Sequence, residues 1–200
     1  MLAIVLASRN EHKISELRSL LVDVAEVHSL DEFPGVPEVD ETGTTFIENA
    51  LLKAKSVATF TGYAALADDS GLEVAALGGA PGVHSSRFSG PKATDASNRA
   101  KLIEVLRGVP SEKRSARFVC AVAIVLPGKP AWTTVGLHDG RILEAPRGTS
   151  GFGYDPLFFS FELGATFAEV PAEVKNRVSH RARAMTQAYE YIRRRSVEHR

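Results

Sequence analysis

In the first part of the chain, short runs of apolar residues alternate with segments in which apolar residues recur at helical spacing. This pattern predicts strands alternating with helices. The run Leu2–Ala7 is short and apolar throughout, a pattern typical of a buried strand. A polar segment follows, and apolar residues then recur at helical spacing from Ile14 to Leu21. Val24–Leu30 has the character of a second strand. The pattern predicts an α/β fold that begins with strand, polar loop, helix and strand.

A second predicted helix begins after Thr45 and ends near Gly62. Glu48 follows Thr45 at the spacing of a capping box, in which each side chain bonds the backbone N–H of the other residue. Gly62 suits the left-handed residue that commonly ends a helix. The apolar face of this helix is expected to be buried and consists of Phe46, Ile47, Ala50, Leu51, Ala54, Val57 and Ala58.

Two adjacent carboxylates, Asp68 and Asp69, end the next apolar run, and Ser70 and Gly71 follow them. A short apolar run bounded in this way predicts a buried strand that stops at the surface. Ligands of open α/β folds bind at such strand ends. Neighbouring carboxylates repel each other, and a hard cation such as Mg²⁺ relieves the repulsion. The alternative is a solvated Asp-Ser-Gly turn, and this stretch alone favours neither.

The second half of the chain predicts a further helix and several antiparallel strands. Asp95–Leu106 has helical periodicity, and Arg117–Leu126 is the strongest strand prediction. Trp132–Leu137 and Arg141–Leu143 flank His138-Asp-Gly140, and Asp-Gly is a strong hairpin signal. Antiparallel strands after a partly parallel first half favour a mixed sheet over a pure Rossmann fold.

Two glycine-rich segments are predicted to be loops with unusual backbone conformations. In Gly78–Arg87, the Ser-Ser-Arg end could line an anion site, although a plain surface loop explains it equally well. In Gly148–Pro156, glycines flank Phe152 and Tyr154, which suits a flat ligand stacked on an aromatic ring. Two core aromatics in a turn are the simpler explanation when this loop is considered alone.

Basic and polar residues lie at two predicted helix starts. The loop Ser8–Lys13 precedes a helix, where free backbone N–H groups favour a phosphate, but any helix cap has this composition and no Walker A spacing is present. Ser179 is a natural cap for the last helix, which places His180 and Arg181 in its first turn. The helix dipole disfavours cations there. An acceptor-rich ligand in front of this pair would explain them.

Composition excludes several classes of protein. The 200 residues suit one domain, 44% are hydrophobic and 24% are charged. Lys plus Arg balances Asp plus Glu at 24 each, so no global field favours a nucleic-acid polymer. Cys120 is the single cysteine and predicts a buried thiol rather than a disulfide. No apolar stretch approaches the roughly 20 residues of a membrane span. We expect a cytoplasmic protein.

Six motifs in order resemble those of the non-canonical purine nucleoside triphosphate pyrophosphatases, the family that includes inosine triphosphate pyrophosphatase. Each motif alone is modest, but six in the family's order are highly specific. One departure is Arg9, where many members have glycine. The resemblance runs from about Ile4 to Ala184. The motifs are Ser8-x-Asn10-x-x-Lys13, Glu41–Asn49, Ala67–Gly71, Gly78–Gly82, Gly151–Pro156 and Ser179–Arg181.

The resemblance implies a fold, an activity and a cofactor. The fold would be an elongated mixed β-sheet flanked by helices, with two lobes and a central substrate cleft. Residues 1–200 would form a single nucleoside triphosphate pyrophosphatase domain, usually in a homodimer. The activity would be hydrolysis of ITP, dITP and XTP to the monophosphate and pyrophosphate, by Mg²⁺-assisted attack of water. This reaction sanitises the nucleotide pool.

The resemblance also implies roles for residues at the matching positions. Glu41 and Asp69 would hold Mg²⁺, and Asp69 would accept the proton of the attacking water. The residues implied to hold the phosphates are Ser8, Asn10 and Lys13, with Lys53 as a weaker candidate. Substrate contacts are also implied for the other residues of this loop, Arg9, Glu11 and His12. The other implied substrate-binding residues are Ser70, Phe152, Gly153, Tyr154, Asp155, Lys175, His180 and Arg181.

The chemistry of the substrate agrees with these roles. A triphosphate carries about four negative charges, so cations are needed before hydroxide can approach phosphorus. Hypoxanthine and xanthine offer an acceptor at position 6 and an N–H at position 1, whereas adenine reverses both. His180 or Arg181 could donate to the 6-oxo group, and Asp155 could accept from N1–H. Guanine shares both features, so its exclusion must depend on position 2.

Two other functions remain compatible with parts of the sequence. A related pyrophosphatase could act on modified pyrimidines, although the glycine-rich loop Gly151–Pro156 and Ser179–Arg181 argue against it. A non-catalytic nucleotide sensor would need a broken acidic site. Glu41, Asp68 and Asp69 are all present, which favours an enzyme.

Overall fold

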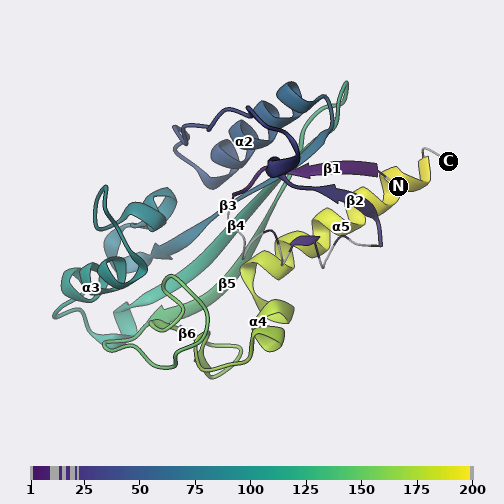
Figure 1. Cartoon of the computed structure of the whole chain (residues 1–200). Helices are drawn as coiled ribbons and strands as arrows, with labels where there is room; N and C mark the ends of the chain where they lie inside the picture. Colours follow the sequence, from purple (N-terminus) through teal and green to yellow (C-terminus); the bar gives the residue numbers. More distant parts are fainter. Residues whose placement is uncertain (1, 10–13, 15–16, 19–20, 22, 199–200) are drawn as a thin grey trace. The chain divides into compact units, whose positions relative to one another are not determined.

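The computed structural model of the chain describes residues 2–9, 14, 17–18, 21 and 23–198 (Figure 1). This part of the chain forms a seven-stranded sheet in the order β2-β1-β3-β4-β5-β6-β7. The strands are β1 (Leu2–Leu6), β2 (Ala25–His28), β3 (Ala64–Val74), β4 (Ser115–Val125), β5 (Trp132–Ile142), β6 (Phe158–Ser160) and β7 (Ala165–Thr166). The helices are α2 (Phe46–Thr61), α3 (Asp95–Val105), α4 (Ala172–Val178) and α5 (His180–Glu198), and the 3₁₀ turns are η1 (Leu30–Glu32), η2 (Ala75–Leu77), η3 (Gly82–Arg87) and η4 (Ser111–Lys113). Within the described ranges, none of the helices has the length and apolarity that crossing a membrane requires.

The sheet is mixed, which confirms the prediction. β1 is parallel to both β2 and β3, and α2 lies in the connection between β2 and β3. β2 and β3 lie on either side of β1 and run in the same direction, so the chain between them has to cross over rather than form a tight turn. β6 is antiparallel to both β5 and β7. Helices flank the sheet, as expected from the alternation of strands and helices in the sequence.

The chain divides into two compact units. The first unit comprises Met1–Asp69, Cys120–Gly136 and Ala182–Arg200, and the second comprises Ser70–Val119 and Leu137–Arg181. The long strands β3, β4 and β5 contribute residues to both units. Helix α2 belongs to the first unit, whereas α3 and α4 belong to the second.

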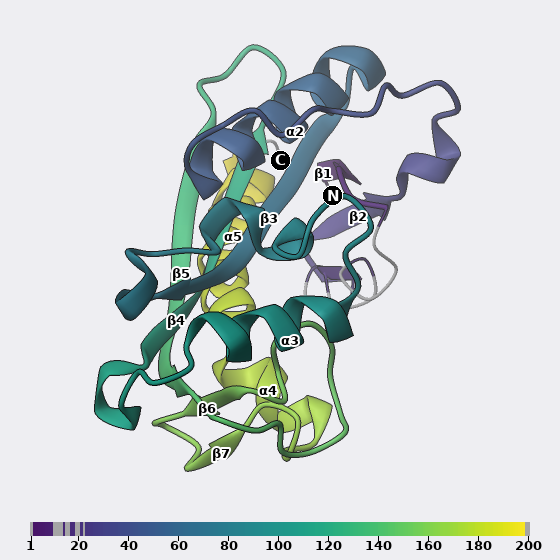
Figure 2. The same ribbon diagram turned by 90° about the vertical axis from the view of Figure 1, so that its left-hand side faces the viewer.

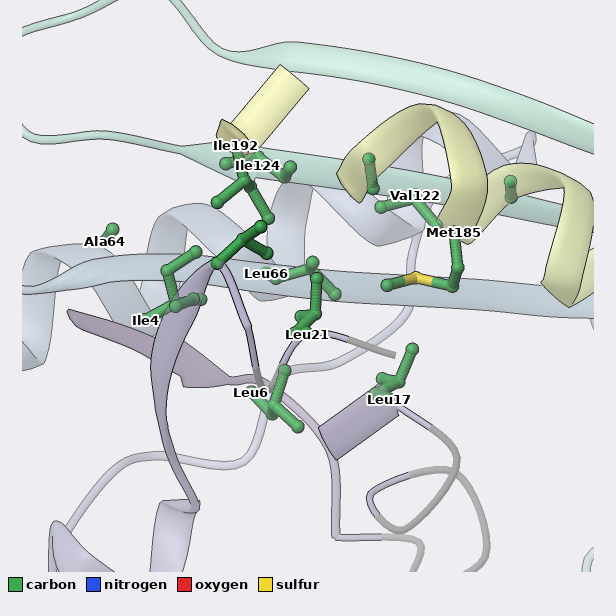
Figure 3. Packing of buried hydrophobic residues seen from close by; sticks show 14 of the residues in the cluster. Ile4, Leu6, Leu17, Leu21, Ala64, Leu66, Val122, Ile124, Met185 and Ile192 are labelled. Carbon is green, nitrogen blue, oxygen red and sulfur yellow. The ribbon is translucent and has the colours of Figure 1, made fainter. Parts of the chain in front are cut away.

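The core of the first unit lies between its part of the sheet and α5. Met185 and Ile192 of α5 pack beside Val122 and Ile124 of β4, and Leu66 of β3 completes this layer (Figure 3). Helix α2 lies on the other side of the strands (Figures 1 and 2). The buried face predicted for the last helix is confirmed, because Ala182, Met185, Ala188 and Ile192 are buried and Tyr189 is partly buried. The predicted first helix is helical and buried at Ile14, Leu17 and Leu21, and Leu20 lies outside the described residues.

The core of the second unit is aromatic. Phe118, Phe158 and Phe167 pack together, with ring centroids 4.5 to 5.8 Å apart. His138 and His180 join this group, and the His180 ring stacks on Phe118 at 4.8 Å. Leu72 and Val74 of β3 and Leu102 and Leu106 of the α3 segment complete the core. Histidines packed against rings in this way are held in fixed orientations.

The prediction that the strand ends at Asp68 and Asp69 is wrong, because β3 continues to Val74, and the alternative of a turn at Gly71 is excluded as well. Leu72 and Val74 are fully buried in the aromatic core, and Gly71 has no positive φ. Burial of these two apolar side chains favours continuing the strand over ending it. The paired aspartates therefore lie within a strand rather than at its end.

The hairpin predicted at Asp139-Gly140 is also wrong, because β5 runs unbroken from Trp132 to Ile142. His138 is 1% exposed, and both of its ring nitrogens are hydrogen bonded, to Ser160 Oγ at 2.7 Å and to the Val178 carbonyl at 2.9 Å. Gly140 pairs with Ser160 in the ladder, and a Cβ on Gly140 would lie 2.3 Å from the Phe159 carbonyl oxygen. The glycine here permits close approach of β6 rather than a turn.

Candidate active site

A cluster of two carboxylates around one lysine lies in the first unit. Lys53 Nζ of α2 is 2.9 Å from Glu41 Oε1 and 3.0 Å from Asp69 Oδ1 of β3. Glu41 comes from the loop before α2. We call Glu41, Lys53 and Asp69 the carboxylate–lysine cluster. All three residues were proposed from the sequence. Lys53 was only a weak candidate for substrate binding there, but in the structure it contacts both carboxylates of the cluster.

Asn49 links the two acidic segments of this cluster. Its side chain is fully buried, and its Nδ2 donates to Asp69 Oδ2 at 3.3 Å while its Oδ1 accepts from the Gly43 N–H at 2.8 Å. A Cβ on Gly43 would lie 2.6 Å from Asn49 Oδ1, so only glycine fits this approach. The loop that carries Glu41 is thereby fixed against the strand that carries Asp69. Sequence reasoning missed Asn49, although a polar residue on the buried face of an amphipathic helix was an available signal.

The start of α2 reinforces the same loop. Thr45 Oγ1 accepts from the Glu48 N–H at 3.2 Å, and Glu48 Oε2 accepts from the Thr45 N–H at 3.1 Å, so the predicted capping box is confirmed. Glu48 Oε2 also accepts from the N–H and the hydroxyl of Thr44. These donors lower the pKa of Glu48 below its ordinary value. Consecutive hydrogen bonds over residues 43–45 position Glu41 two residues upstream.

The carboxylates of the cluster keep Lys53 charged. Burial by itself lowers the pKa of Lys53, but Asp69, Glu41 and Asp68 outweigh burial and raise that pKa. Lys53 is therefore a stable ammonium ion. The carboxylate oxygens of Glu41 and Asp69 that hold this ammonium lie 2.9 and 3.0 Å from it. Carboxylate oxygens are the ligands that hard divalent cations prefer.

Asp68 and Asp69 do not form the paired site that their adjacency in sequence suggested. Successive side chains on a strand point to opposite faces. Asp69 faces Asn49 and Lys53 of α2, whereas Asp68 Oδ2 lies 4.0 Å from Cys120 Sγ, a member of the core packed against α5. The described residues contain no group of three or more His, Cys, Asp or Glu side chains arranged to hold a metal. They offer a two-carboxylate set, Glu41 and Asp69.

The predicted phosphate loop is described only at its beginning. Ser8 and Arg9 follow β1, where the Ala7 N–H donates to the Leu66 carbonyl at 2.8 Å and keeps the strand end in register with β3. Arg9 Nη2 donates to the Val36 carbonyl at 3.3 Å. The remaining predicted residues of this loop, Asn10, Glu11, His12 and Lys13, lie outside the described residues.

A buried ion pair organises the glycine loop Gly148–Pro156 in the second unit. Lys175 Nζ of α4 donates to Asp155 Oδ2 at 2.5 Å, and the same oxygen accepts from the Phe152 N–H at 3.0 Å. Asp155 and Lys175 are 2% and 6% exposed. Burial raises the pKa of Asp155, and Lys175 offsets part of that increase. A Cβ on Gly151 would lie 2.2 Å from Asp155 Oδ2, which explains the glycine before Phe152.

Cationic groups gather around Phe152. Lys175 Nζ lies 4.6 Å and Arg181 Cζ lies 5.9 Å from the centroid of its ring. His180 and Arg181 occupy the first turn of α5, as predicted, and are 5% and 4% exposed. Buried cations at a helix start are unfavourable by themselves. Five of the predicted base-binding residues thus lie in one neighbourhood of the second unit, namely Phe152, Asp155, Lys175, His180 and Arg181.

The remaining predicted positions of this unit have structural partners. The Tyr154 hydroxyl donates to the Ser85 carbonyl at 2.8 Å, and burial, with the nearby Asp95 charge, raises the pKa of Tyr154. Ser85, suggested as part of an anion site, instead accepts the Leu72 N–H at 2.9 Å and donates to a carbonyl of its own turn. Ser70 is a partly buried residue of β3, two positions before Leu72.

Comparison with known proteins identifies relatives over nearly the whole chain. The model of the Ham1 family matches residues 4–191. The dITP/XTP pyrophosphatase of Geobacter sulfurreducens is 50% identical over 199 residues, which cover 99% of this chain and 100% of that protein. The dITP/XTP pyrophosphatase of Desulfotalea psychrophila is 54% identical over 185 residues, which cover 92% of this chain and 82% of that protein. The solved HAM1 protein of Coxiella burnetii has a TM-score of 0.90 and 44% identity, covering 96% of this chain and 98% of that one.

The chain belongs to the Ham1 family. The family model matches residues 4–191, and the mixed sheet matches those of solved Ham1 proteins. Within it, the named relatives at about half identity are dITP/XTP pyrophosphatases. The family resemblance inferred from the six motifs is therefore confirmed.

Proposed function

We propose that this protein hydrolyses dITP, ITP and XTP to the nucleoside monophosphate and pyrophosphate, and so removes deaminated purines from the nucleotide pool. The names of the relatives support the substrate class. The observation on which the mechanism depends is the convergence of Glu41 and Asp69 on Lys53 within 3.0 Å. Two carboxylates beside a fixed ammonium suit a reaction that must hold a cation against a triphosphate.

We propose Mg²⁺ as the cofactor, held by Glu41 and Asp69. The fit is supported by two carboxylate oxygens that already converge on one positive centre, because hard divalent cations prefer such oxygen ligands. The bound ion would supply charge neutralisation of the phosphates. Lys53 would contribute a permanent positive charge toward the same oxygens, because its ammonium stays protonated.

Asp69 is the proposed proton acceptor for the attacking water. Its Oδ1 bonds Lys53, and Asn49 donates to its Oδ2, so both oxygens have fixed directions. A carboxylate held in this way can take a proton without first reorganising. The residues proposed to hold the phosphates are Ser8, Asn10 and Lys13, and Arg9, Glu11 and His12 of the same loop are proposed to contact the substrate.

The proposed contacts to the purine come from the glycine loop and the start of α5. Phe152 would stack on the base, and His180 or Arg181 would donate to the 6-oxo group. Because Asp155 Oδ2 already binds Lys175 and the Phe152 N–H, Asp155 would orient these two groups, and its other oxygen is the candidate acceptor for N1–H. The remaining proposed contacts are Ser70, Gly153, Tyr154 and Lys175. Donors left unpaired against adenine would carry a large penalty.

Release of pyrophosphate across a panel of triphosphates tests this proposal. We expect rapid release from dITP, ITP and XTP with Mg²⁺ present, little from dGTP or dATP, and none without a divalent cation. Preferential cleavage of modified pyrimidine triphosphates would reassign the substrate class. Tight binding of dITP without cleavage in the presence of Mg²⁺ would favour a sensor.

We also propose a homodimer that acts in the cytoplasm. The single buried cysteine is in keeping with a reducing compartment. Light scattering coupled to size-exclusion chromatography would measure the oligomeric state, and a mass of one chain would contradict the dimer.

A further inference from the structure

Helix α3 holds the glycine loop at a single residue from two directions. The Gly153 N–H donates to Asp95 Oδ2 at 2.6 Å, and Arg99 Nη1 donates to the Gly153 carbonyl oxygen at 2.6 Å. Asp95 and Arg99 are four positions apart and therefore lie on the same face of the helix. Gly153 has a φ of +58°, a left-handed conformation that the two hydrogen bonds fix. We call this arrangement the α3 clamp.

The same helix also holds the neighbouring η3 segment. Asn98 is 3% exposed, and its Oδ1 accepts from the Ser89 N–H at 2.7 Å while its Nδ2 donates to the Ser86 carbonyl at 3.0 Å. The Tyr154 hydroxyl bonds the Ser85 carbonyl and so connects the two segments directly. Three side chains of α3 and one of the glycine loop thus form a continuous hydrogen-bonded frame.

Simpler explanations do not account for the α3 clamp. An aspartate in the first turn is favoured by the helix dipole wherever its side chain points. A partly buried arginine is usually placed by its aliphatic stem. Neither tendency makes the two side chains meet one glycine that is 58 and 54 residues away in sequence. Their convergence indicates a specific position for this backbone.

We propose that Asp95 and Arg99 are positioning residues that set the selectivity of the glycine loop for the purine base, an inference that rests on the proposed function. Gly153 lies between Phe152 and Tyr154, so its backbone decides the direction of the stacking ring. Bases that differ only in exocyclic groups are discriminated when mismatched donors cannot move to other partners. A loop released from α3 could move, and the penalty against the wrong base would fall.

Amide hydrogen exchange tests the clamp without any turnover. In Asp95→Ala, the Gly153 amide loses its acceptor, and we expect faster exchange in residues 151–154 because local opening becomes easier. Asp95→Asn keeps an acceptor oxygen and should retain most of the protection. Glu104→Ala, an exposed residue at the far end of the same helix, is the matched control and should exchange like the wild type.

Kinetic selectivity tests the consequence. We expect Asp95→Ala and Arg99→Met to lower the dITP-to-dGTP ratio of kcat/KM about tenfold, the effect of one net hydrogen bond. KM for dITP should rise more than kcat falls, because the reacting atoms are untouched. Arg99→Lys keeps a donor and should restore most of the ratio, whereas Glu104→Ala should leave it unchanged.

The two proposals fail in different ways. If the wild type releases no pyrophosphate from dITP, the proposed function is wrong, and the exchange measurement still reports on the clamp. If the wild type is active and Asp95→Ala retains Gly153 protection, the clamp is wrong. Loss of protection with an unchanged dITP-to-dGTP ratio would overturn the role in selectivity.

Discussion

Asp69 shows how much of its proposed role comes from neighbours distant in sequence. Its carboxylate receives one hydrogen bond from Asn49 and one from Lys53, both on α2. Asp68, one position earlier, lies beside Cys120 in an apolar core instead. The two residues have the same chemistry, and strand alternation alone gives them different surroundings. A residue's role here follows from its face of the strand.

Replacement of Asp69 by asparagine should abolish turnover while preserving the fold. The amide keeps the shape of the side chain but cannot accept a proton, so we expect kcat to fall by about 100- to 10,000-fold. Pyrophosphate release measures the loss, and circular dichroism checks the fold. Asp139→Asn, an exposed aspartate on β5, is the matched control. Activity of Asp69→Asn near that of the control would exclude Asp69 as the base.

Replacement of Phe152 by alanine should weaken nucleotide binding. The ring lies beside two cations on a glycine-flanked turn, and stacking of a base on an aromatic ring contributes about 1–3 kcal/mol. KM for dITP should rise accordingly. Phe161→Ala, which removes a 58% exposed ring of the same unit, is the control and should have the wild-type KM. Equal KM values for the two variants would count against stacking.

At the scale of elements, the N-terminus of α2 connects stability to the proposed site. The capping box satisfies backbone N–H groups that would otherwise lack partners, and the same glutamate holds the loop that leads back to Glu41. The ionised Glu48 side chain thus fixes residues 44 and 45, close in sequence to Glu41. Loss of the cap through Thr45→Ala typically destabilises a protein by about 0.5–2 kcal/mol.

The contribution of Glu48 to stability should depend on pH. Its pKa is lowered in the folded chain from an ordinary value of 4.5 by hydrogen bonds from Thr44 and Thr45. The stabilisation is therefore present above 4.5 and is lost as pH falls through the lower, folded pKa. Urea unfolding should show Glu48→Gln less stable than the wild type at pH 7, with the difference narrowing in acid. A difference that stays constant with pH, as expected for the Glu104→Gln control, would contradict this assignment.

At the scale of the whole molecule, each unit has its own core and its own part of the proposed machinery. The carboxylate–lysine cluster belongs to the first unit, and the glycine loop with Lys175, His180 and Arg181 belongs to the second. The first core is aliphatic and packs against α5, whereas the second is built on phenylalanines. The residues proposed to bind the metal and those proposed to bind the base therefore belong to separately packed parts of one chain.

Binding of substrate should stabilise the folded chain. The Asp69→Asn variant is suited to the measurement because it should bind dITP without consuming it. Ligand at about 100 times its dissociation constant adds about 2.7 kcal/mol to stability. Thermal unfolding should therefore shift upward with dITP and Mg²⁺, and much less with dATP at the same concentration. Equal shifts for the two nucleotides would contradict recognition of the 6-oxo group.

Much of the fold could be predicted from the sequence because the signals are local. The apolar runs became β1 and β4, and the Thr45–Glu48 spacing became the cap of α2. The short strands β6 and β7 and the seven-residue helix α4 were missed. Segments of this length have little periodicity, and long-range pairing decides their conformation. The motifs pointed to most of the proposed site residues but not to Asn49, Asp95 and Arg99, because the contacts of these three are with residues distant in sequence.

The sequence by itself determined the alternation of strands and helices, the mixed character of the sheet and the family, since each depends on residue type and spacing along the chain. Only the tertiary structure decided that Gly71 and Gly140 lie inside strands, that Asp68 and Asp69 face apart, and that Lys53 stands between two carboxylates. Local preferences for turns are weak compared with burial of residues such as Leu72 and close packing of β5 against β6. The stabilisation from this burial and packing comes from contacts between segments that are far apart in sequence and become neighbours only when the chain folds.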